Sequence, residues 1–269
     1  MIKRGFVDIA EGQLHYRRAG GGSKPTLVVF HAAPAASGVL ERMLAVMGRT
    51  RPAIAFDALG MGDSSPPAVA TPSVADYVSA TARALEALGI TRYDAHGILT
   101  GANSAIELAI QRPDRVGKIV VDRLLVMDAA TRAEWLKSYA PDSPPDAFGN
   151  QFRFAWHFVR DEYCFFPWYL RDGAHRSIRS IPNAEQMHDK VVEVLKGIRT
   201  YHHFLRAGLN YPASERLALV KAPVMVNADG ARFRPGAVVK HHRAIPDATF
   251  EPDEAIAANV AEIVAFLDA

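Results

Sequence analysis

Short apolar runs that alternate with amphipathic stretches constrain the fold of this chain more than any other feature of its sequence. Such a run is expected for a strand that is buried on both faces of a sheet. Two of them are clear, at residues 26–30 and 53–57, and further strands are predicted at 92–95, 118–121 and 222–227. Stretches with helical spacing lie between them, at 39–47, 74–88 and 101–111. Strands that alternate with helices imply parallel βαβ units, so the sequence predicts an α/β fold with a mostly parallel central sheet and flanking helices.

Residues 129–216 interrupt this alternation. The segment is rich in helix formers, aromatic residues and arginines, and it contains the loop Pro-Asp-Ser-Pro-Pro at 141–145. The α/β pattern then resumes, with a strand at 222–227, a short strand near 248–250 and a final helix at 255–267. We therefore predict a core domain made of residues 1–128 and 217–269, with residues 129–216 inserted as a helical cap over the carboxyl ends of the strands.

Composition excludes several classes of protein. The chain has 269 residues, and 31 basic and 29 acidic side chains give it a formal charge of +2. That balance gives no basic footprint for nucleic acid. No apolar run approaches the roughly 20 residues of a membrane helix, and the N-terminus has no apolar segment of a signal peptide. The single cysteine, Cys164, cannot form an internal disulfide, so we expect a cytoplasmic protein.

Three turns carry sequence motifs. The first predicted strand is followed by His-Ala-Ala-Pro at 31–34, and the second leads into Asp-Ala-Leu-Gly-Met-Gly-Asp-Ser at 57–64. A third strand leads into Gly-Ile-Leu-Thr-Gly at 97–101. In this order and spacing, the motifs resemble those of the α/β-hydrolase superfamily over essentially the whole chain. The resemblance implies a nucleophile elbow, a sharp strand-to-helix turn, at 97–101. It also implies an oxyanion hole formed by the backbone N–H groups of Ala33 and Thr100.

The chain departs from this family at each position of the expected catalytic triad. Leu99 stands at the elbow, where the family has Ser, Cys or Asp. Moving the elbow to Thr100 would put Ile98 and Ala102 where the tight turn needs glycine. By spacing, the acid position falls on Arg232, although Asp229 lies a few residues earlier, and no histidine follows His242. We therefore predict a degenerate triad, with Leu99 and Arg232 in place of the nucleophile and the acid.

Histidines at strand ends are the candidates for proton transfer without a nucleophile, because histidine titrates near ~6.5. His31 and His96 both follow or end predicted strands near the expected pocket. A structural role is the favoured interpretation of each, and for His31 it is a hydrogen bond that braces its loop. Thr100 is a third catalytic candidate, because its hydroxyl could act if a nearby histidine activated it.

The predicted cap supplies candidates for a substrate pocket. Trp156 and Arg160 are four residues apart and would share a helix face, where the arginine could pair with a substrate carboxylate. The alternative is that Arg160 makes a surface pair with Asp161. The predicted pocket comprises Trp156, His157, Arg160, Trp168 and Tyr169, although Trp168 and Tyr169 could equally pack the cap.

Three functions fit these features. The favoured one is a cofactor-independent lyase, hydratase or isomerase that acts on a small, partly apolar, anionic molecule and uses the oxyanion hole. The alternatives are a ligand-binding pseudoenzyme and an ester or amide hydrolase with rearranged catalytic groups. We expect no metal, because His202 and His203 lack partners at ligand spacing. We expect no dinucleotide, because Gly60 and Gly62 lack a third glycine. A small molecule is the expected partner, and the architecture is compatible with a homodimer.

Overall fold

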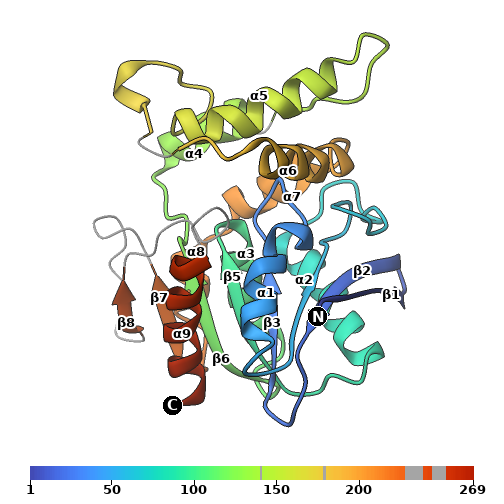
Figure 1. Cartoon of the computed structure of the whole chain (residues 1–269), viewed down its shortest axis with the longest axis vertical. Coiled ribbons are helices and arrows are strands. Elements are labelled where there is room, and N and C mark those ends of the chain that lie inside the picture. Colours follow the sequence, from blue (N-terminus) through green and yellow to red (C-terminus); the bar gives the residue numbers. More distant parts are fainter. Residues whose placement is uncertain (140, 178–179, 228–238, 244–252) are drawn as a thin grey trace.

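One mixed sheet forms the centre of the protein (Figure 1). The computed structural model describes residues 1–139, 141–177, 180–227, 239–243 and 253–269. Within them, eight strands are ordered β1-β2-β4-β3-β5-β6-β7-β8. The antiparallel pairings are β1 with β2 and β2 with β4, and the remaining strands pair in parallel. The strands are β1 Lys3–Ile9, β2 Gly12–Ala19, β3 Thr26–Phe30, β4 Ala53–Phe56, β5 Tyr93–Ile98, β6 Val116–Asp122, β7 Val224–Asn227 and β8 Val239–Arg243.

Helices cover both faces of the sheet, which explains the uninterrupted apolar runs of its strands. In β3, Leu27 and Val29 belong to the apolar cluster with α1 and α9, whereas Val28 and Phe30 belong to the cluster with α2 and α3. The sheet is therefore the middle of three layers. The helical elements of this part are η1 Ser37–Leu40, α1 Glu41–Met47, α2 Val74–Ala87, α3 Thr100–Gln111 and α9 Asp253–Asp268.

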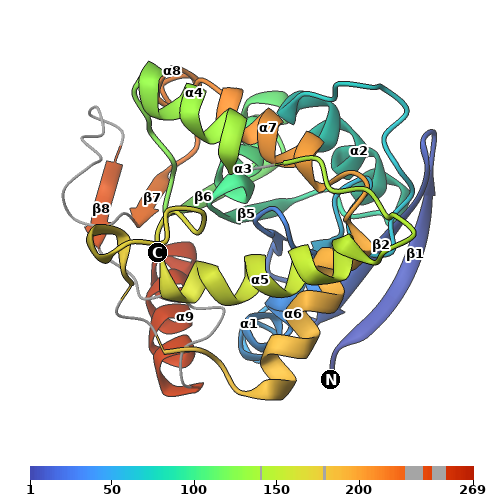
Figure 2. The ribbon, with the colours of Figure 1, turned by 90° about the horizontal axis from the view of Figure 1, so that it is seen from above.

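The helices between β6 and β7 lie beyond the carboxyl edge of the parallel strands (Figure 1). Seen from above, α4, α5, α6 and α7 spread across that edge (Figure 2). We call this segment the insertion; its elements are α4 Ala129–Ser138, α5 Asn150–Cys164, η2 Gly173–His175, α6 Ala184–Lys196, α7 Tyr201–Asn210 and α8 Ala213–Leu217. Its treatment as a separate cap domain stays a prediction.

Polar contacts join the insertion to the rest of the fold. Arg216 of α8 binds the buried carboxylate of Glu107 on α3, with Nη2 2.7 Å from Oε2 and 2.9 Å from Oε1. Lys196 at the end of α6 lies 2.9 Å from the carboxylate of Asp63. The buried Glu193 of α6 rests on Gly38 of η1, where an added Cβ would lie 2.8 Å from its carboxylate. The insertion is therefore anchored to the core through the C-terminal end of α6 and through α8.

The predicted α/β fold is confirmed. Residues 239–243, which include His241 and His242, form a strand, β8, that the sequence analysis did not predict. Its sequence, Val-Lys-His-His-Arg, is mostly polar and so gives no apolar signal. Such a composition is tolerated because β8 pairs with β7 at the edge of the sheet. The strand predicted near 248–250 lies outside the described residues. Among those described, no helix combines the length and apolarity needed to cross a membrane.

Candidate active site

The turn after β5 has the backbone of a nucleophile elbow, with Leu99 at its tip. The backbone of Leu99 has φ 53° and ψ −115°, a conformation that residues other than glycine rarely adopt. An added Cβ at Gly97 would overlap the carbonyl oxygen of Gly101 and lie 2.7 Å from the amide nitrogen of Ala102. An added Cβ at Gly101 would lie 2.6 Å from the carbonyl oxygen of His31. Both flanking positions therefore require glycine, which puts residue 99 at the tip.

Leu99 is held on both its backbone and its side chain. Its N–H donates to the carbonyl oxygen of Asp122 on β6, 2.9 Å away. Its half-buried side chain packs against the apolar cluster that contains α1 and α9. A leucine has no atom that could attack a carbonyl carbon. The elbow consequently presents an apolar side chain at the position where the family that the sequence resembles has its nucleophile.

The Thr100 side chain fills the space beside the predicted oxyanion hole. The Ala33 N–H donates to Thr100 Oγ1 over 2.8 Å. Thr100 is 1% exposed, and an added Cβ at Gly208 of α7 would lie 2.6 Å from its methyl group. The Asn103 amide holds α7 there by donating to the Gly208 carbonyl oxygen, 3.0 Å away. One of the two predicted donors for a ligand oxygen is thus engaged inside the protein.

His31 uses both ring nitrogens in contacts with the backbone. Its Nδ1 lies 2.9 Å from the carbonyl oxygen of Ala32, and its Nε2 accepts from the Ala58 N–H over 3.0 Å. This pattern requires the neutral ring with its proton on Nδ1. Burial lowers the pKa of His31, which favours the same neutral form. The side chain therefore joins the turn after β3 to the turn after β4.

His96 lies on the face of β5 that packs toward α1 and α9. Because side chains alternate along a strand, His96 shares a face of β5 with Ile98, which packs toward α1 and α9. Its Nε2 pairs with the carboxylate of Asp122 on the neighbouring strand. His96 is fully buried, and its Nδ1 has no hydrogen-bond partner among the described residues. The structure does not bring His31 and His96 together at one site.

The predicted pocket residues of the insertion divide into two groups. Trp168 is 7% exposed; it donates to the Tyr139 carbonyl oxygen over 3.2 Å and contacts Phe158 and Tyr169 edge-on. Trp168 and Tyr169 therefore belong to the aromatic interior of the insertion. Trp156 on α5 is 46% exposed, and His157 beside it is half-buried.

Arg160 makes the ion pair that the sequence offered as the alternative to ligand binding. Its Nη2 lies 2.7 Å from the carboxylate of Asp161, the next residue on α5. Asp161 is completely buried and also pairs with Arg171, whose Nε lies 2.8 Å away. Two arginines therefore share one carboxylate at this end of α5.

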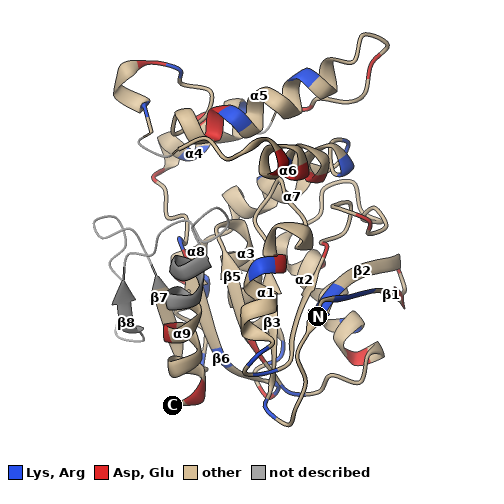
Figure 3. Cartoon of the chain, viewed as in Figure 1, with Lys and Arg blue, Asp and Glu red and all other residues tan. Residues whose placement is uncertain are grey.

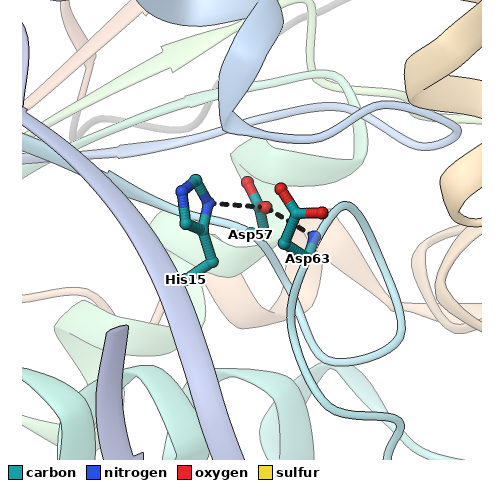
Figure 4. A group of neighbouring side chains, drawn as sticks. All are labelled: His15, Asp57 and Asp63. Carbon is teal, nitrogen blue, oxygen red and sulfur yellow. Dashed lines mark hydrogen bonds and ion pairs between the residues drawn. The ribbon is translucent and has the colours of Figure 1, made fainter. Parts of the chain in front are cut away.

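The loop after β4 is organised around the carboxylate of Asp57 (Figure 4). Asp57 accepts hydrogen bonds from the Ser37 N–H at 2.7 Å and the Asp63 N–H at 2.9 Å, and it contacts His15 Nδ1 at 2.9 Å. Burial alone would raise the pKa of Asp57, but the hydrogen bonds from His15, Ser37 and Asp63 outweigh it and hold the pKa well below its ordinary range. Asp57 is therefore an ionised structural anchor.

Among the described residues, His15, Asp57 and Asp63 form a group with the geometry of metal ligands. Single ligand atoms of His15, Asp57 and Asp63 lie within 4.8 Å of one another. The ligand atoms of Asp57 and His15 already bind each other, and the Asp63 carboxylate pairs with Lys196. The group satisfies itself without an ion, so nothing in it calls for a metal.

A small cavity lies behind His31, between the sheet and α2, α3 and α7. Its volume of about 10 Å³ is enough for about one water molecule. The lining residues are Phe30, His31, Phe56, Ala58, Tyr77, Thr81, Ser104 and Phe204. This cavity is too small for an organic substrate.

Arg123 is a residue that the sequence reasoning missed. It follows β6 directly, and its φ of 51° makes it, with Leu99, one of the described non-glycine residues in the left-handed region. The preceding residue, Asp122, accepts the Leu99 N–H, so Arg123 adjoins the elbow at the carboxyl edge of the sheet. Only glycine signals such a backbone from sequence, so no pattern pointed to Arg123. Arg232 and Asp229, the predicted acid positions, lie outside the described residues.

Comparisons with known proteins agree on the fold. No family model matches the chain. It is 34% identical over 127 residues to a 2-hydroxy-6-oxononadienedioate/2-hydroxy-6-oxononatrienedioate hydrolase of Paraburkholderia xenovorans (strain LB400), a match that covers 43% of each chain. The chain thus aligns with less than half the length of the curated relatives it matches.

Two solved structures are similar over nearly the whole chain. Epoxide hydrolase A from Mycobacterium thermoresistibile has a TM-score of 0.77 at 16% identity and covers 100% of this chain and 99% of its own. The enol-lactonase from Burkholderia xenovorans LB400 has a TM-score of 0.67 at 14% identity and covers 98% of this chain and 100% of its own. The chain therefore has the α/β-hydrolase fold.

Proposed function

We propose that this protein binds a small, partly apolar, anionic molecule at the elbow by non-covalent contacts alone. The observation that carries the proposal is a pair of features at the turn: Leu99 occupies the strained tip, and the Thr100 hydroxyl receives the Ala33 N–H. The first replaces a nucleophile by an apolar surface. The second removes a donor that acyl transfer would need. A ligand-binding site without covalent chemistry is what this arrangement favours.

Charge at the carboxyl edge supports an anionic ligand. The helix α3 begins at Thr100 without a side-chain cap, so its N-terminal dipole is directed at the elbow. Arg123 adds a positive charge on the adjoining strand end. The named substrate of the Paraburkholderia relative is an unsaturated dicarboxylate that carries oxo and hydroxy groups. A conjugated dicarboxylate of this class would place its carbon chain on Leu99 and a carboxylate near the N-terminus of α3.

A non-hydrolytic enzyme is the second candidate, and the uncapped N-terminus of α3 favours it. The same donors that hold a carboxylate could stabilise an enolate in a lyase, hydratase or isomerase. Such a reaction requires a ligand oxygen to displace the Thr100 hydroxyl from the Ala33 N–H. It also requires a proton-transfer group, for which neutral His31 would have to give up a backbone contact.

A hydrolase that uses Thr100 as its nucleophile has less support. Thr100 is 1% exposed, and its side chain lies between the Ala33 N–H and Gly208. Attack on an ester would require the hydroxyl to leave this position and reach a base.

Calorimetric titration with a conjugated six-carbon dicarboxylate, hexadienedioate, tests the proposal. We expect saturable binding by the wild type and recovery of the ligand with unchanged mass. Arg123→Gln should weaken binding about tenfold, since a tenfold change corresponds to one charge-assisted contact of about 1.4 kcal/mol. Arg92→Gln, an exposed arginine before β5, is the control and should bind normally. Absence of saturable binding, or cleavage of the dicarboxylate, would overturn the proposal.

A further inference from the structure

Three aromatic side chains form an exposed line on α5 and the turn before it. Phe152 and Trp156 are four residues apart on α5 and so lie about one helical turn apart, and Phe148 lies in the turn before the helix. Phe148, Phe152 and Trp156 are 91%, 60% and 46% exposed. Aromatic side chains of this size at these exposures leave roughly 400 Å² of mostly apolar surface in water. We call Phe148, Phe152 and Trp156 the α5 stripe.

The rest of the outward face of α5 is basic. Arg153 is exposed and Arg160 half-exposed beside the stripe, whereas the acidic residues of α5 turn inward. Asp161 is fully buried, and Glu162 pairs with Lys190 of α6 at 3.2 Å. The stripe is therefore an apolar surface whose own helix adds no outward carboxylate to it.

Charged residues lie at both ends of the stripe (Figure 3). The turn before α5 carries the exposed carboxylates of Asp142 and Asp146. The far end carries Arg160 and Arg171, which share the carboxylate of Asp161, and the exposed Asp172 and Arg176 follow; these three arginines and two aspartates leave one positive charge in excess. The order along the stripe is thus acidic, aromatic, basic.

We propose that a second copy of this chain covers the α5 stripe, with the two α5 helices antiparallel about a two-fold axis. An antiparallel arrangement sets the acidic end of one stripe against the basic end of the other, whereas a parallel arrangement opposes like charges. The axis lies midway between Phe152 and Trp156, so Phe152 packs on Trp156 of the partner subunit. Because the surface is complementary to itself, the contact closes as a dimer and does not propagate.

The area of the stripe sets the strength of the dimer. A stable interface buries about 800 Å² on each partner, and the aromatic side chains alone supply about half of that. The flanking arginines and the turn at 141–149 add to this area. We therefore expect a reversible dimer with a dissociation constant in the micromolar range.

Sedimentation equilibrium over a range of micromolar concentrations tests the interface. We expect the wild type to shift from dimer to monomer on dilution, and Trp156→Asp to raise the dissociation constant at least about tenfold, equivalent to about 1.4 kcal/mol. Leu219→Asp, at an exposed apolar residue outside the stripe, is the control and should behave as the wild type. A wild type that stays monomeric, or a Trp156→Asp variant that dimerises normally, overturns the proposal.

Cysteine cross-linking tests the direction of packing. In a Cys164→Ser background, a mixture of Phe152→Cys and Trp156→Cys chains should form a mixed disulfide dimer faster than either chain alone. Faster formation of the two unmixed dimers would contradict antiparallel packing. Binding to phosphatidylglycerol vesicles tests whether a lipid surface covers the stripe instead. If the wild type is monomeric and binds the vesicles, and Trp156→Asp does not bind them, the stripe is a lipid-binding surface and the dimer proposal is wrong.

Discussion

The turns after β4 and β5 lie at the same edge of the sheet, and they keep different parts of their motifs. The loop after β4 keeps its side chain: Asp57 is buried and accepts hydrogen bonds from Ser37, Asp63 and His15. The elbow after β5 keeps its backbone, with Leu99 at the strained tip. The difference teaches that close glycine packing can hold the shape of a turn whatever side chain stands at its tip.

Replacement of an elbow glycine should have the largest effect. Gly97→Ala puts a methyl group onto the backbone of Gly101 and Ala102, neither of which can move without shifting α3. We expect a loss of more than about 3 kcal/mol in the free energy of unfolding, measured by urea denaturation. Gly21→Ala is the control, because an added Cβ there meets nothing within 4 Å. Equal stability of the two variants would show that glycine packing does not maintain the elbow.

Removal of the anchor in the other turn should come next. Asp57→Ala leaves His15 and two backbone N–H groups without their acceptor, which should cost about 3 kcal/mol of unfolding free energy. Asp63→Ala removes a half-exposed carboxylate that pairs with Lys196, and it should cost no more than about 1 kcal/mol. The same denaturation experiment measures both. If Asp63→Ala proves the more damaging, the loop depends on its surface pair and not on its buried anchor.

Thr100 offers a smaller and more specific test. Thr100→Val keeps the shape but leaves the Ala33 N–H without its acceptor, so we expect a loss of about 1–3 kcal/mol. Thr100→Ser keeps the acceptor, and its loss should be near the ~1 kcal/mol of one buried methyl group. A serine variant less stable than the valine variant would mean that packing on Gly208, and not the hydrogen bond, holds this residue.

The smallest expected effect is the contribution of His31 to the pH dependence of the free energy of unfolding. Burial lowers the pKa of His31 below the ordinary 6.5. Below pH 6.5 the unfolded chain therefore binds a proton at His31 more readily than the folded protein does. Stability should therefore fall as pH drops below 6.5, and a second decline should follow below the ordinary 3.8 of Asp57, whose pKa is also lowered. Urea denaturation at several pH values measures this, and His31→Gln should flatten the first decline. An unchanged slope in that variant would place the proton uptake on another group.

The sequence predicted the features that local sterics decide. The buried strands follow from uninterrupted apolar runs, and the position of Leu99 follows from the need for glycine at 97 and 101. The polar strand β8 was missed because an edge strand needs no apolar run. The Thr100 contact was missed because it joins residues 67 apart, which no local pattern links.

The sequence also could not predict which face of α5 in the insertion is buried. Aromatic residues occur all around α5, so periodicity could not tell which face is buried. The sequence put Trp156 and Arg160 on one helix face but could not show what surrounds that face: Trp156 is 46% exposed and Arg160 pairs with Asp161. The buried pair of Asp161 with two arginines orients the helix, and its geometry appears only once α5 and Arg171 are placed together.

Hydrolysis of p-nitrophenyl acetate tests the central claim most directly, because any acyl-transfer nucleophile would release nitrophenol. The account predicts that the wild type, Thr100→Ala and Leu99→Ala all give the rate of buffer alone, and that mass spectrometry of the wild type shows no acetyl adduct. Turnover by the wild type that is lost in Thr100→Ala would contradict the account, because it would identify Thr100 as a working nucleophile.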